Sequence, residues 1–487
     1  MTRSKTKHMT FSNEKSPLTN ESKKQSQKPE SITALAHDAF FENLFSKEYQ
    51  RLANAGQTYL DFTGGNLHGQ SQLDQHFKML SEQVLGNPHS TNPSSQLATK
   101  LVTEARQKVL DFFNTEDDYF CIFTQNASGA LKIVGECYPF NQQSFFLLFS
   151  DNHNSVNGIR EYALNQGADF KYSSIQYEDL RIHDEDLLTE LNAHEKAENK
   201  LFAFPAQSNV SGVKHDLSWI KKAQDLGWDV LLDAAAYVPT SKLDLQKVQP
   251  DFVSVSFYKI FGYPTGIGCL LVKKSSFNKL EKRWFAGGTV TLASVNAAHH
   301  YLARDHERFE NGTINYLDIP AIKIGLDYIE KIGVERINER ITDLINYLFI
   351  QLCKIKHDNG EPLVKIFGPK DRKLVGGTLI MNFFDPNGNL YPFEKIEEMA
   401  NEELISIRSG CFCNPGIDEI NNCVTNEELS DYFTSRDDGN YQDMVNYLHK
   451  MRGATRVSVG LATRQKDLDK FIDFAEKLKN RPCTFKL

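Results

Sequence analysis

The sequence predicts an α/β fold, in which a mostly parallel central sheet is covered by helices and is followed by a smaller α+β region. Short apolar segments with the composition of buried strands recur between Phe120 and Ser256. Helical or polar stretches separate these segments from one another. Such alternation is typical of parallel sheets with helices on their faces.

The composition limits the kinds of molecule that this protein could bind and the cellular compartment in which we expect it. The 487 residues are enough for two or three domains, and a hydrophobic content of 40% is ordinary for a globular protein. The net charge of -8 opposes binding to nucleic acid or to anionic membranes. We find no apolar stretch of membrane-spanning length and no secretory signal at the N-terminus. The eight cysteines are scattered rather than arranged as a disulfide framework, so we expect a cytoplasmic protein.

The first elements follow a polar leader. Residues 1–32 are rich in Lys, Ser, Asn and Gln, and we expect them to be disordered. Leu73, Phe77, Leu80 and Val84 then recur at helical spacing, and Gly86-Asn-Pro88 is expected to close that helix. A second helix is predicted from an apolar face made of Leu97, Leu101, Ala105, Val109 and Phe112.

Residues 120–134 read as a strand, a polar turn and a helix. The turn, Thr124-Gln-Asn-Ala-Ser128, would place free backbone N–H groups at a helix N-terminus, which is a natural phosphate-binding arrangement. A simple N-cap explains the same residues, and the sequence leaves both interpretations open.

Polar residues follow the ends of the next strands, which we predict at 144–149, 201–204, 229–232 and 251–256. These residues are His153, Asn209, Asp233, Ser256 and Lys259. The carboxyl ends of parallel strands share one edge of a sheet, where such folds bind ligands. The sequence therefore predicts that these five side chains meet in one site.

Lys259 stands where the last apolar run gives way to a cluster of glycines and a proline, which predicts a turn. A lysine in a partly desolvated pocket there would have a lowered pKa and could act as a nucleophile or base. The alternative is a strand-end lysine that extends into solvent.

The C-terminal third begins with a helical pattern over residues 318–347. Strand-like segments at 374–375, 378–382 and 457–459 then alternate with charged helices, the last at 466–479. We expect a large ligand-binding domain at 33–320, whose N-terminal segment also contributes to the small domain. The small domain would comprise residues 321–487.

Six motifs give the chain a family resemblance. They are Tyr59-Leu-Asp-Phe, Gly86-Asn-Pro-His-Ser90, Phe123-Thr-Gln-Asn-Ala-Ser128, Leu232-Asp-Ala-Ala-Ala-Tyr237, Ser256-Phe-Tyr-Lys-Ile-Phe-Gly262 with Tyr-Pro-Thr-Gly266, and Arg408-Ser-Gly-Cys-Phe-Cys-Asn414. The chain resembles the fold-type I pyridoxal-phosphate enzymes of the class V aminotransferase and cysteine desulfurase group. Within that group it is most similar to the N-terminal domain of the molybdenum cofactor sulfurases.

The resemblance implies roles for particular residues. Lys259 would bind pyridoxal 5'-phosphate covalently and then move the proton at the substrate α-carbon, while Asp233 would pair with the pyridine nitrogen. His153 would lie over the ring and act catalytically as a proton shuttle, although ordinary hydrogen bonding is the alternative for an isolated histidine after a strand. Asn209 would contact the ring hydroxyl. The remaining implied ligands are Ala127, Ser128 and Ser256 for the phosphate, Thr289 for the phosphate of a neighbouring subunit, and Arg456 for the substrate carboxylate.

Cys413 aligns with the family's persulfide-forming cysteine. Arg408 lies near it in sequence, and the surrounding Gly and Pro residues suggest an exposed loop, which favours a reactive thiolate. A metal site with Cys423 is an alternative, although the spacing fits no standard zinc pattern, so we expect none.

Together these features predict a homodimeric enzyme that takes sulfur from L-cysteine as a Cys413 persulfide and releases alanine. A sulfur-acceptor protein or cofactor would be its further partner, and the resemblance does not identify it. The alternative function is a class V aminotransferase or amino-acid lyase in which Cys413 is not catalytic. A scaffold that has lost its chemistry is disfavoured by the presence of Lys259, Asp233, His153 and Arg456.

Overall fold

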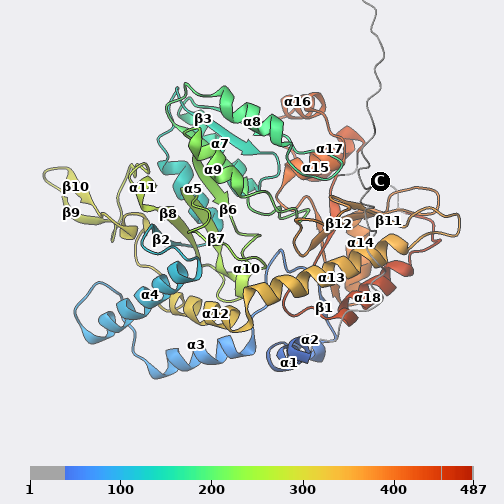
Figure 1. Cartoon of the computed structure of the whole chain (residues 1–487), viewed down its shortest axis with the longest axis horizontal. Coiled ribbons are helices and arrows are strands. Elements are labelled where there is room, and N and C mark those ends of the chain that lie inside the picture. The colour runs from blue at the N-terminus through green and yellow to red at the C-terminus, as the bar shows by residue number, and fades with distance from the viewer. Residues whose placement is uncertain (1–38, 451, 485–487) are drawn as a thin grey trace, which may run out of the picture.

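The computed structural model describes residues 39–450 and 452–484 (Figure 1). The leader predicted to be disordered, residues 1–32, lies outside the described part. A seven-stranded sheet and a four-stranded sheet form the centres of two regions, which lie side by side in Figure 1. The predicted α/β class with a mostly parallel sheet is confirmed.

The large sheet has the strand order β2-β8-β7-β6-β5-β3-β4. Strands β7, β6, β5, β3 and β4 pair in parallel, and β8 is antiparallel to both of its neighbours. The strands are β2 (Tyr119–Thr124), β3 (Phe145–Phe149), β4 (Asp169–Ser173), β5 (Lys200–Pro205), β6 (Asp229–Asp233), β7 (Phe252–Ser256) and β8 (Gly268–Lys273).

Two apolar layers bury this sheet. On one face, α5 (Ala127–Cys137) and α7 (Ile159–Asn165) pack on side chains such as Phe146, Leu148 and Leu231. On the other face, α4 (Pro93–Phe112), α9 (Ser218–Asp225) and α12 (Ile319–Ile332) pack on the alternate residues, such as Phe202 and Leu232. Burial on both faces explains why the strands read as continuous apolar runs in the sequence.

The small sheet is antiparallel, with the order β11-β12-β15-β14. Its strands are β11 (Val364–Phe367), β12 (Thr378–Phe383), β14 (Arg408–Gly410) and β15 (Ala454–Ser458). Beside it, β1 (Thr58–Tyr59) pairs in parallel with β13 (Ile405–Ser406), so the N-terminal segment lies with the C-terminal region. The domain boundary at residue 320 remains a prediction.

The remaining elements connect and surround the two sheets. The N-terminal helices are α1 (Ala39–Glu48), α2 (Gln50–Asn54) and α3 (Gln70–Glu82). Around the large sheet lie α6 (Asn154–Asn157), α8 (Asp184–Ala193), α10 (Phe257–Phe261), α11 (Lys274–Phe277), the hairpin β9 (Val290–Ser294) and β10 (His299–Leu302), and the 3₁₀ turn His306–Phe309. The C-terminal helices are α13 (Val334–Lys354), α14 (Phe393–Glu402), α15 (Pro415–Asn421), α16 (Asn426–Thr434), α17 (Tyr441–Leu448) and α18 (Gln465–Glu476).

Three sequence predictions need correction. The predicted glycine turn begins at Gly262, but Lys259, at the junction before it, lies in a short helix, α10, that the sequence did not predict. Helix α3 ends at Glu82, and part of its predicted apolar face is exposed, with Phe77 at 74% and Leu80 at 38%. Val84 lies beyond the helix and is 79% exposed. Residues 374–375 form no strand, because Leu374 has a positive φ and Val375 makes an isolated bridge.

Two further findings concern membranes and thiols. No helix in the described part of the chain has the length and apolarity needed to cross a membrane. All eight cysteines lie in described residues, and each is a free thiol.

Candidate active site

A cavity of about 160 Å³ lies at the carboxyl edge of the large sheet. Its lining includes all five side chains that follow the predicted strand ends, namely His153, Asn209, Asp233, Ser256 and Lys259. Ala127 and Ser128 line it from the first turn of α5. The structure thus brings together residues that are up to 133 positions apart, since the lining extends from Asn126 to Lys259.

Lys259 follows β7 directly, because α10 begins at the residue after that strand. Gly262 ends α10 with φ +81°, and a Cβ there would collide with the backbone of residues 67 and 68. The Lys259 amine makes no hydrogen bond or ion pair with any described residue. Burial lowers its pKa, Asp233 opposes that shift, and Arg456 and Arg408 add to it. These are the properties of an amine held ready for a covalent partner.

Asp233 ends β6 and is 9% exposed. Its Oδ1 accepts hydrogen bonds from the Ser254 hydroxyl (2.9 Å) and from the Ala235 backbone N–H (3.1 Å). Its Oδ2 accepts none from the described residues. A fixed carboxylate with one free oxygen suits a protonated ring nitrogen as its partner.

His153 precedes α6 and caps it, since its Nδ1 accepts a hydrogen bond from the Ser155 N–H (3.1 Å). Burial and Lys259 lower the pKa of His153, whereas Asp233 raises it. The ring is therefore neutral at pH 7, with its proton on Nε2 because Nδ1 is an acceptor.

The N-terminus of α5 forms another part of the cavity wall. The Ser256 hydroxyl accepts a hydrogen bond from Ala127 N–H (2.9 Å), and the hydroxyls of Ser128 and Ser155 lie 2.6 Å apart. A Cβ on Gly268 would lie 2.5 Å from the Val255 carbonyl oxygen and 2.7 Å from Asn126 Cα. Glycine at 268 therefore permits strand and helix to approach closely, and the resulting cluster of N–H and O–H groups suits a phosphate.

Thr289 does not line the cavity in the single chain. It is fully buried in the loop before β9, where its hydroxyl donates to the Ala286 carbonyl and accepts from the Ala286 N–H, both at 2.9 Å. The following β9–β10 hairpin extends away from the rest of the chain (Figure 1).

Arg456 is buried and does not line the cavity. It comes from β15, and its guanidinium donates to Asp61 Oδ1 (2.8 Å) and to the Asn209 carbonyl (2.8 Å). Arg408 binds the other Asp61 oxygen (2.9 Å). The Nε of Arg456 is buried and has no hydrogen-bond partner among the described residues. This guanidinium thus retains a donor for an incoming acceptor.

The Cys413 loop approaches the cavity from the small sheet, and the Cys413 side chain is exposed. The amide of Asn209 donates to the Phe412 carbonyl (2.8 Å), and the Asn154 N–H donates to the Cys413 carbonyl (2.7 Å). The charge of a Cys413 thiolate contributes to the pKa of Lys259. The loop that carries the thiol is therefore anchored on residues that adjoin the cavity.

Sequence reasoning missed two residues of this anchor, Asn414 and Asp151. Asn414 is fully buried and donates to Asp151 Oδ1 (2.7 Å) and to Asn209 Oδ1 (3.1 Å). The pattern Asn414-Pro415 was an available signal, because Asn at an N-cap before Pro marks a helix start. No sequence signal pointed to Asp151.

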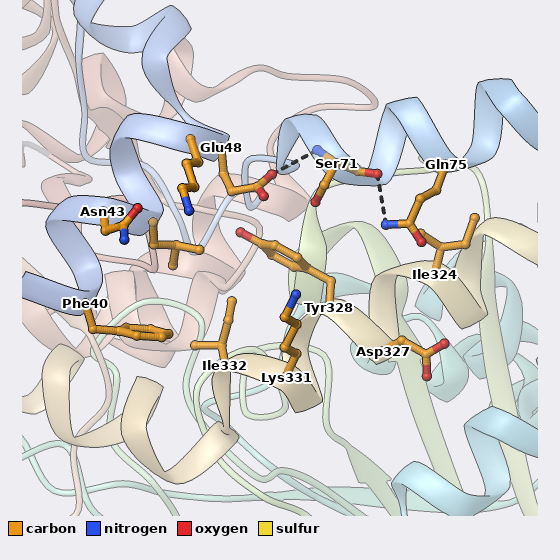
Figure 2. A pocket seen from close by; sticks show the side chains of 12 residues that line it. Phe40, Asn43, Glu48, Ser71, Gln75, Ile324, Asp327, Tyr328, Lys331 and Ile332 are labelled. Atoms are coloured by element: carbon orange, nitrogen blue, oxygen red, sulfur yellow. Dashed lines mark hydrogen bonds between the residues drawn. The ribbon is translucent and has the colours of Figure 1, made fainter.

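A larger cavity, of about 430 Å³, lies between α1, α3 and α12 (Figure 2). Figure 2 shows Tyr328 and Ile332 among its apolar walls, with Glu48 bound to the Ser71 N–H (2.9 Å) at one side. None of the predicted site residues lines this cavity. In the described residues, no group of three or more His, Cys, Asp or Glu side chains is placed to hold a metal ion.

Comparisons of the sequence identify relatives of this chain. A family model described as "Aminotransferase class-V" matches residues 58–471. Human molybdenum cofactor sulfurase is 35% identical over 461 residues, covering 88% of this chain and 50% of the relative. The sulfurase of Solanum lycopersicum is 35% identical over 473 residues, covering 89% and 57%. The chain thus spans about half the length of the curated relatives it matches.

Solved structures show the same fold. The cysteine desulfurase of Thermococcus onnurineus NA1 has a TM-score of 0.74 at 23% identity, covering 90% of this chain and 97% of that one. The cysteine desulfurase CsdA of Escherichia coli has a TM-score of 0.71 at 19% identity, covering 90% and 98%.

Proposed function

The chain belongs to the class V aminotransferase family, and on this basis we propose that it is a pyridoxal-phosphate-dependent cysteine desulfurase that transfers sulfur from L-cysteine to Cys413. One observation carries the proposal. A partnerless, partly buried Lys259 shares a cavity with Asp233, and the Cys413 loop is hydrogen-bonded to residues of the same site.

The residues present fit the cofactor. Lys259 would attach it, Asp233 Oδ2 would accept a hydrogen bond from the pyridine nitrogen, and Asn209 and His153 would contact the ring. Ala127, Ser128 and Ser256 would hold the phosphate at the N-terminus of α5, where the helix dipole favours an anion. When bound, pyridoxal phosphate withdraws electrons from the substrate α-carbon, which allows the C–S bond to break.

The chain's own groups then perform the transfer. Lys259, with its lowered pKa, takes the proton from the substrate α-carbon and returns a proton to the product. Arg456 orients the substrate carboxylate. The Cys413 thiolate attacks the substrate sulfur. In total, the Cys413 thiol and cysteine give a Cys413 persulfide and alanine, so atoms and electrons balance.

The test is a single turnover with L-cysteine and no reductant. Native protein is expected to form alanine and Cys413 persulfide in equal amounts. Cys413→Ser should keep the visible absorption of the bound cofactor and lose both products, whereas the control Cys353→Ser, an exposed thiol on α13, should behave as native. Unchanged turnover in Cys413→Ser would contradict the proposal. Pyruvate in place of alanine would point to a lyase.

We also propose a homodimer with shared active sites. Supporting features are the outward position of the β9–β10 hairpin and its exposed apolar side chains, with Leu292 at 61% and Tyr301 at 58%. Phe77 and Val84 near α3 are also exposed. Thr289 does not line the cavity of its own chain and is buried in its own loop, so its contact with the phosphate of the neighbouring chain would require that loop to rearrange in the dimer.

A cytoplasmic location and a downstream sulfur acceptor complete the proposal. The eight free thiols suit a reducing compartment. The curated relatives are named for the molybdenum cofactor, which makes that cofactor the first acceptor to test. No nucleic-acid or membrane partner is proposed, because the net charge of -8 disfavours anionic surfaces.

A further inference from the structure

The Cys413 loop has a backbone that needs external support. Phe412 and Cys413 have φ of +57° and +55°, in the left-handed region that non-glycine residues seldom adopt. Two such residues in succession persist only where surrounding contacts hold them. The Asn209 and Asn154 contacts hold the two carbonyls of the loop. A further set of contacts holds Asn414.

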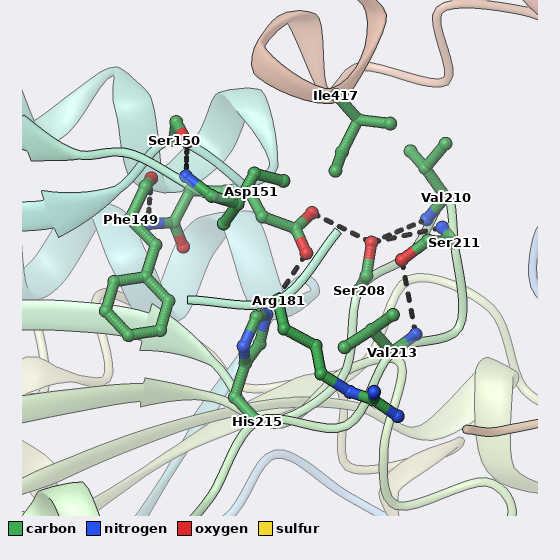
Figure 3. A network of polar contacts seen from close by, with 12 residues as sticks. Phe149, Ser150, Asp151, Arg181, Ser208, Val210, Ser211, Val213, His215 and Ile417 are labelled. Atoms are coloured by element: carbon green, nitrogen blue, oxygen red, sulfur yellow. Dashed lines mark hydrogen bonds and ion pairs between the residues drawn. The ribbon is translucent and has the colours of Figure 1, made fainter. Parts of the chain in front are cut away.

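Asp151 lies at the centre of that set. It follows β3, is fully buried, and its Oδ1 accepts from Asn414 (2.7 Å) and from the Ser208 hydroxyl (2.8 Å). Its Oδ2 contacts His215 Nε2 at 3.1 Å, and that histidine is also buried. Figure 3 shows the Asp151 carboxylate between Ser208 and His215. A buried carboxylate with three side-chain partners is a fixed point in the structure.

The same carboxylate also organises the cofactor side of the site. The Ser208 hydroxyl accepts from the N–H groups of Val210 (3.3 Å) and Ser211 (3.1 Å), as Figure 3 shows. These bonds fix the turn that carries Asn209. Asn209 in turn contacts both Asn414 and the Phe412 carbonyl. Asp151 therefore supports the thiol loop by two routes, directly through Asn414 and indirectly through the turn at Asn209.

We propose that Asp151, oriented by His215, is a positioning residue that fixes the Cys413 loop relative to Lys259 and Asn209. This inference rests on the proposed function, since positioning matters only if the Cys413 thiol receives sulfur. Close packing adds support, because Gly416 in the first turn of α15 leaves no room for a Cβ against the Ser150 carbonyl. This close contact couples the position of the segment around Asp151 to that of the start of α15.

The experiment uses the 487-residue chain with and without added pyridoxal phosphate. Hydrogen exchange is measured by mass spectrometry on peptides that cover residues 409–420, and sulfur release from cysteine is measured in parallel. In Asp151→Asn, we expect these amides to exchange about tenfold faster and kcat to fall about tenfold with little change in KM. Asp385→Asn is the matched control, because Asp385 is equally buried and multiply hydrogen-bonded but holds a distant turn.

Two further variants keep the test decisive. Ser208→Ala removes the hydrogen bond that Ser208 donates to Asp151 and the two that it accepts from Val210 and Ser211. It keeps the Asp151 carboxylate and should give the same changes at smaller size if Asp151→Asn does not fold. Combining Asp151→Asn with Asn414→Asp reverses the donor and acceptor and should restore part of the exchange protection.

The outcomes separate the two proposals. Native exchange over 409–420 in Asp151→Asn, or faster exchange with native kcat, would overturn the positioning role. If the native protein releases no sulfur, the proposed function fails, and the exchange data still decide whether Asp151 holds the loop.

Discussion

At the scale of single residues, the buried ammonium of Lys259 lowers the stability of the folded chain. Burial disfavours its ammonium, and among the described residues it has no hydrogen-bond or ion-pair partner to offset that cost. Asp233 offsets the cost in part, and Arg456 and Arg408 increase it. Such local instability is common at functional sites, where the binding of a ligand or cofactor relieves it.

Replacing Lys259 with Met should therefore stabilise the cofactor-free protein. We expect the free energy of unfolding at pH 7 to rise by about 1 kcal/mol. The folded pKa of Lys259 lies below the unfolded value, so the native chain gains stability as pH rises through the folded pKa towards 10.5. The advantage of Lys259→Met should accordingly shrink between pH 7 and pH 10. Urea unfolding followed by circular dichroism measures both values, and a less stable variant at pH 7 would contradict the argument.

At the scale of elements, Gly268 determines how closely α5 approaches the sheet. Gly268 begins β8 and pairs with Thr124 of β2 on one side and Ser256 of β7 on the other. An added Cβ would meet backbone on both sides, and backbone cannot rotate away as a side chain can. The shape of the cavity at the N-terminus of α5, where we expect the phosphate to bind, therefore requires that residue 268 has no Cβ.

Gly268→Ala should separate α5 from the sheet. We expect it to lower the free energy of unfolding by about 2 kcal/mol, because overpacking costs of that size are typical. It should also weaken pyridoxal phosphate binding, measured by titration of the cofactor-free protein. The matched control is Gly158→Ala, since Gly158 has helical φ and ψ and its added Cβ meets only one carbonyl at 3.4 Å. That control should gain about 0.5 kcal/mol, and equal losses in the two variants would refute the packing argument.

The elements also show what the sequence could predict. Strand ends were predictable because an apolar run and the polar residue after it are local signals, so His153, Asn209 and Asp233 were placed correctly at one edge. Helix α10 was missed because five residues carry too little periodicity. The contact between Asp151 and Asn414 joins residues 263 positions apart, and no local pattern encodes such a pairing. The sequence also could not predict that apolar side chains of α3 are exposed. Helical spacing of apolar residues predicts a helix, but it does not show which elements pack against that helix.

At the scale of the whole molecule, the site lies where the two regions meet. The large region supplies Asp233 from β6 and Lys259 from α10, and the small region supplies Arg456 and the Cys413 loop. Asp61, from the N-terminal segment, accepts from Arg456 and Arg408 and so ties that segment to the small sheet. The Cys413 thiol and the Lys259 amine thus come from different regions, so their relative position depends on how the two regions pack together.

Thr289 extends this argument from one chain to two. Its hydroxyl is satisfied within its own loop, and it does not line the cavity of its own chain. If it acts on a neighbouring chain, each active site needs residues from two chains. A chain with Lys259→Ala and a chain with Thr289→Ala would then carry complementary defects.

Mixing these two variants tests the shared site. After the mixture is unfolded and refolded together, half of the dimers should contain one chain of each kind. In such a dimer, one site combines an intact Lys259 with the intact Thr289 of the other chain. The mixture should therefore regain about a quarter of native sulfur release, well above the average of the two variants refolded separately. If Thr289 serves its own chain instead, neither site in the mixed dimer is complete, and activity stays at that average.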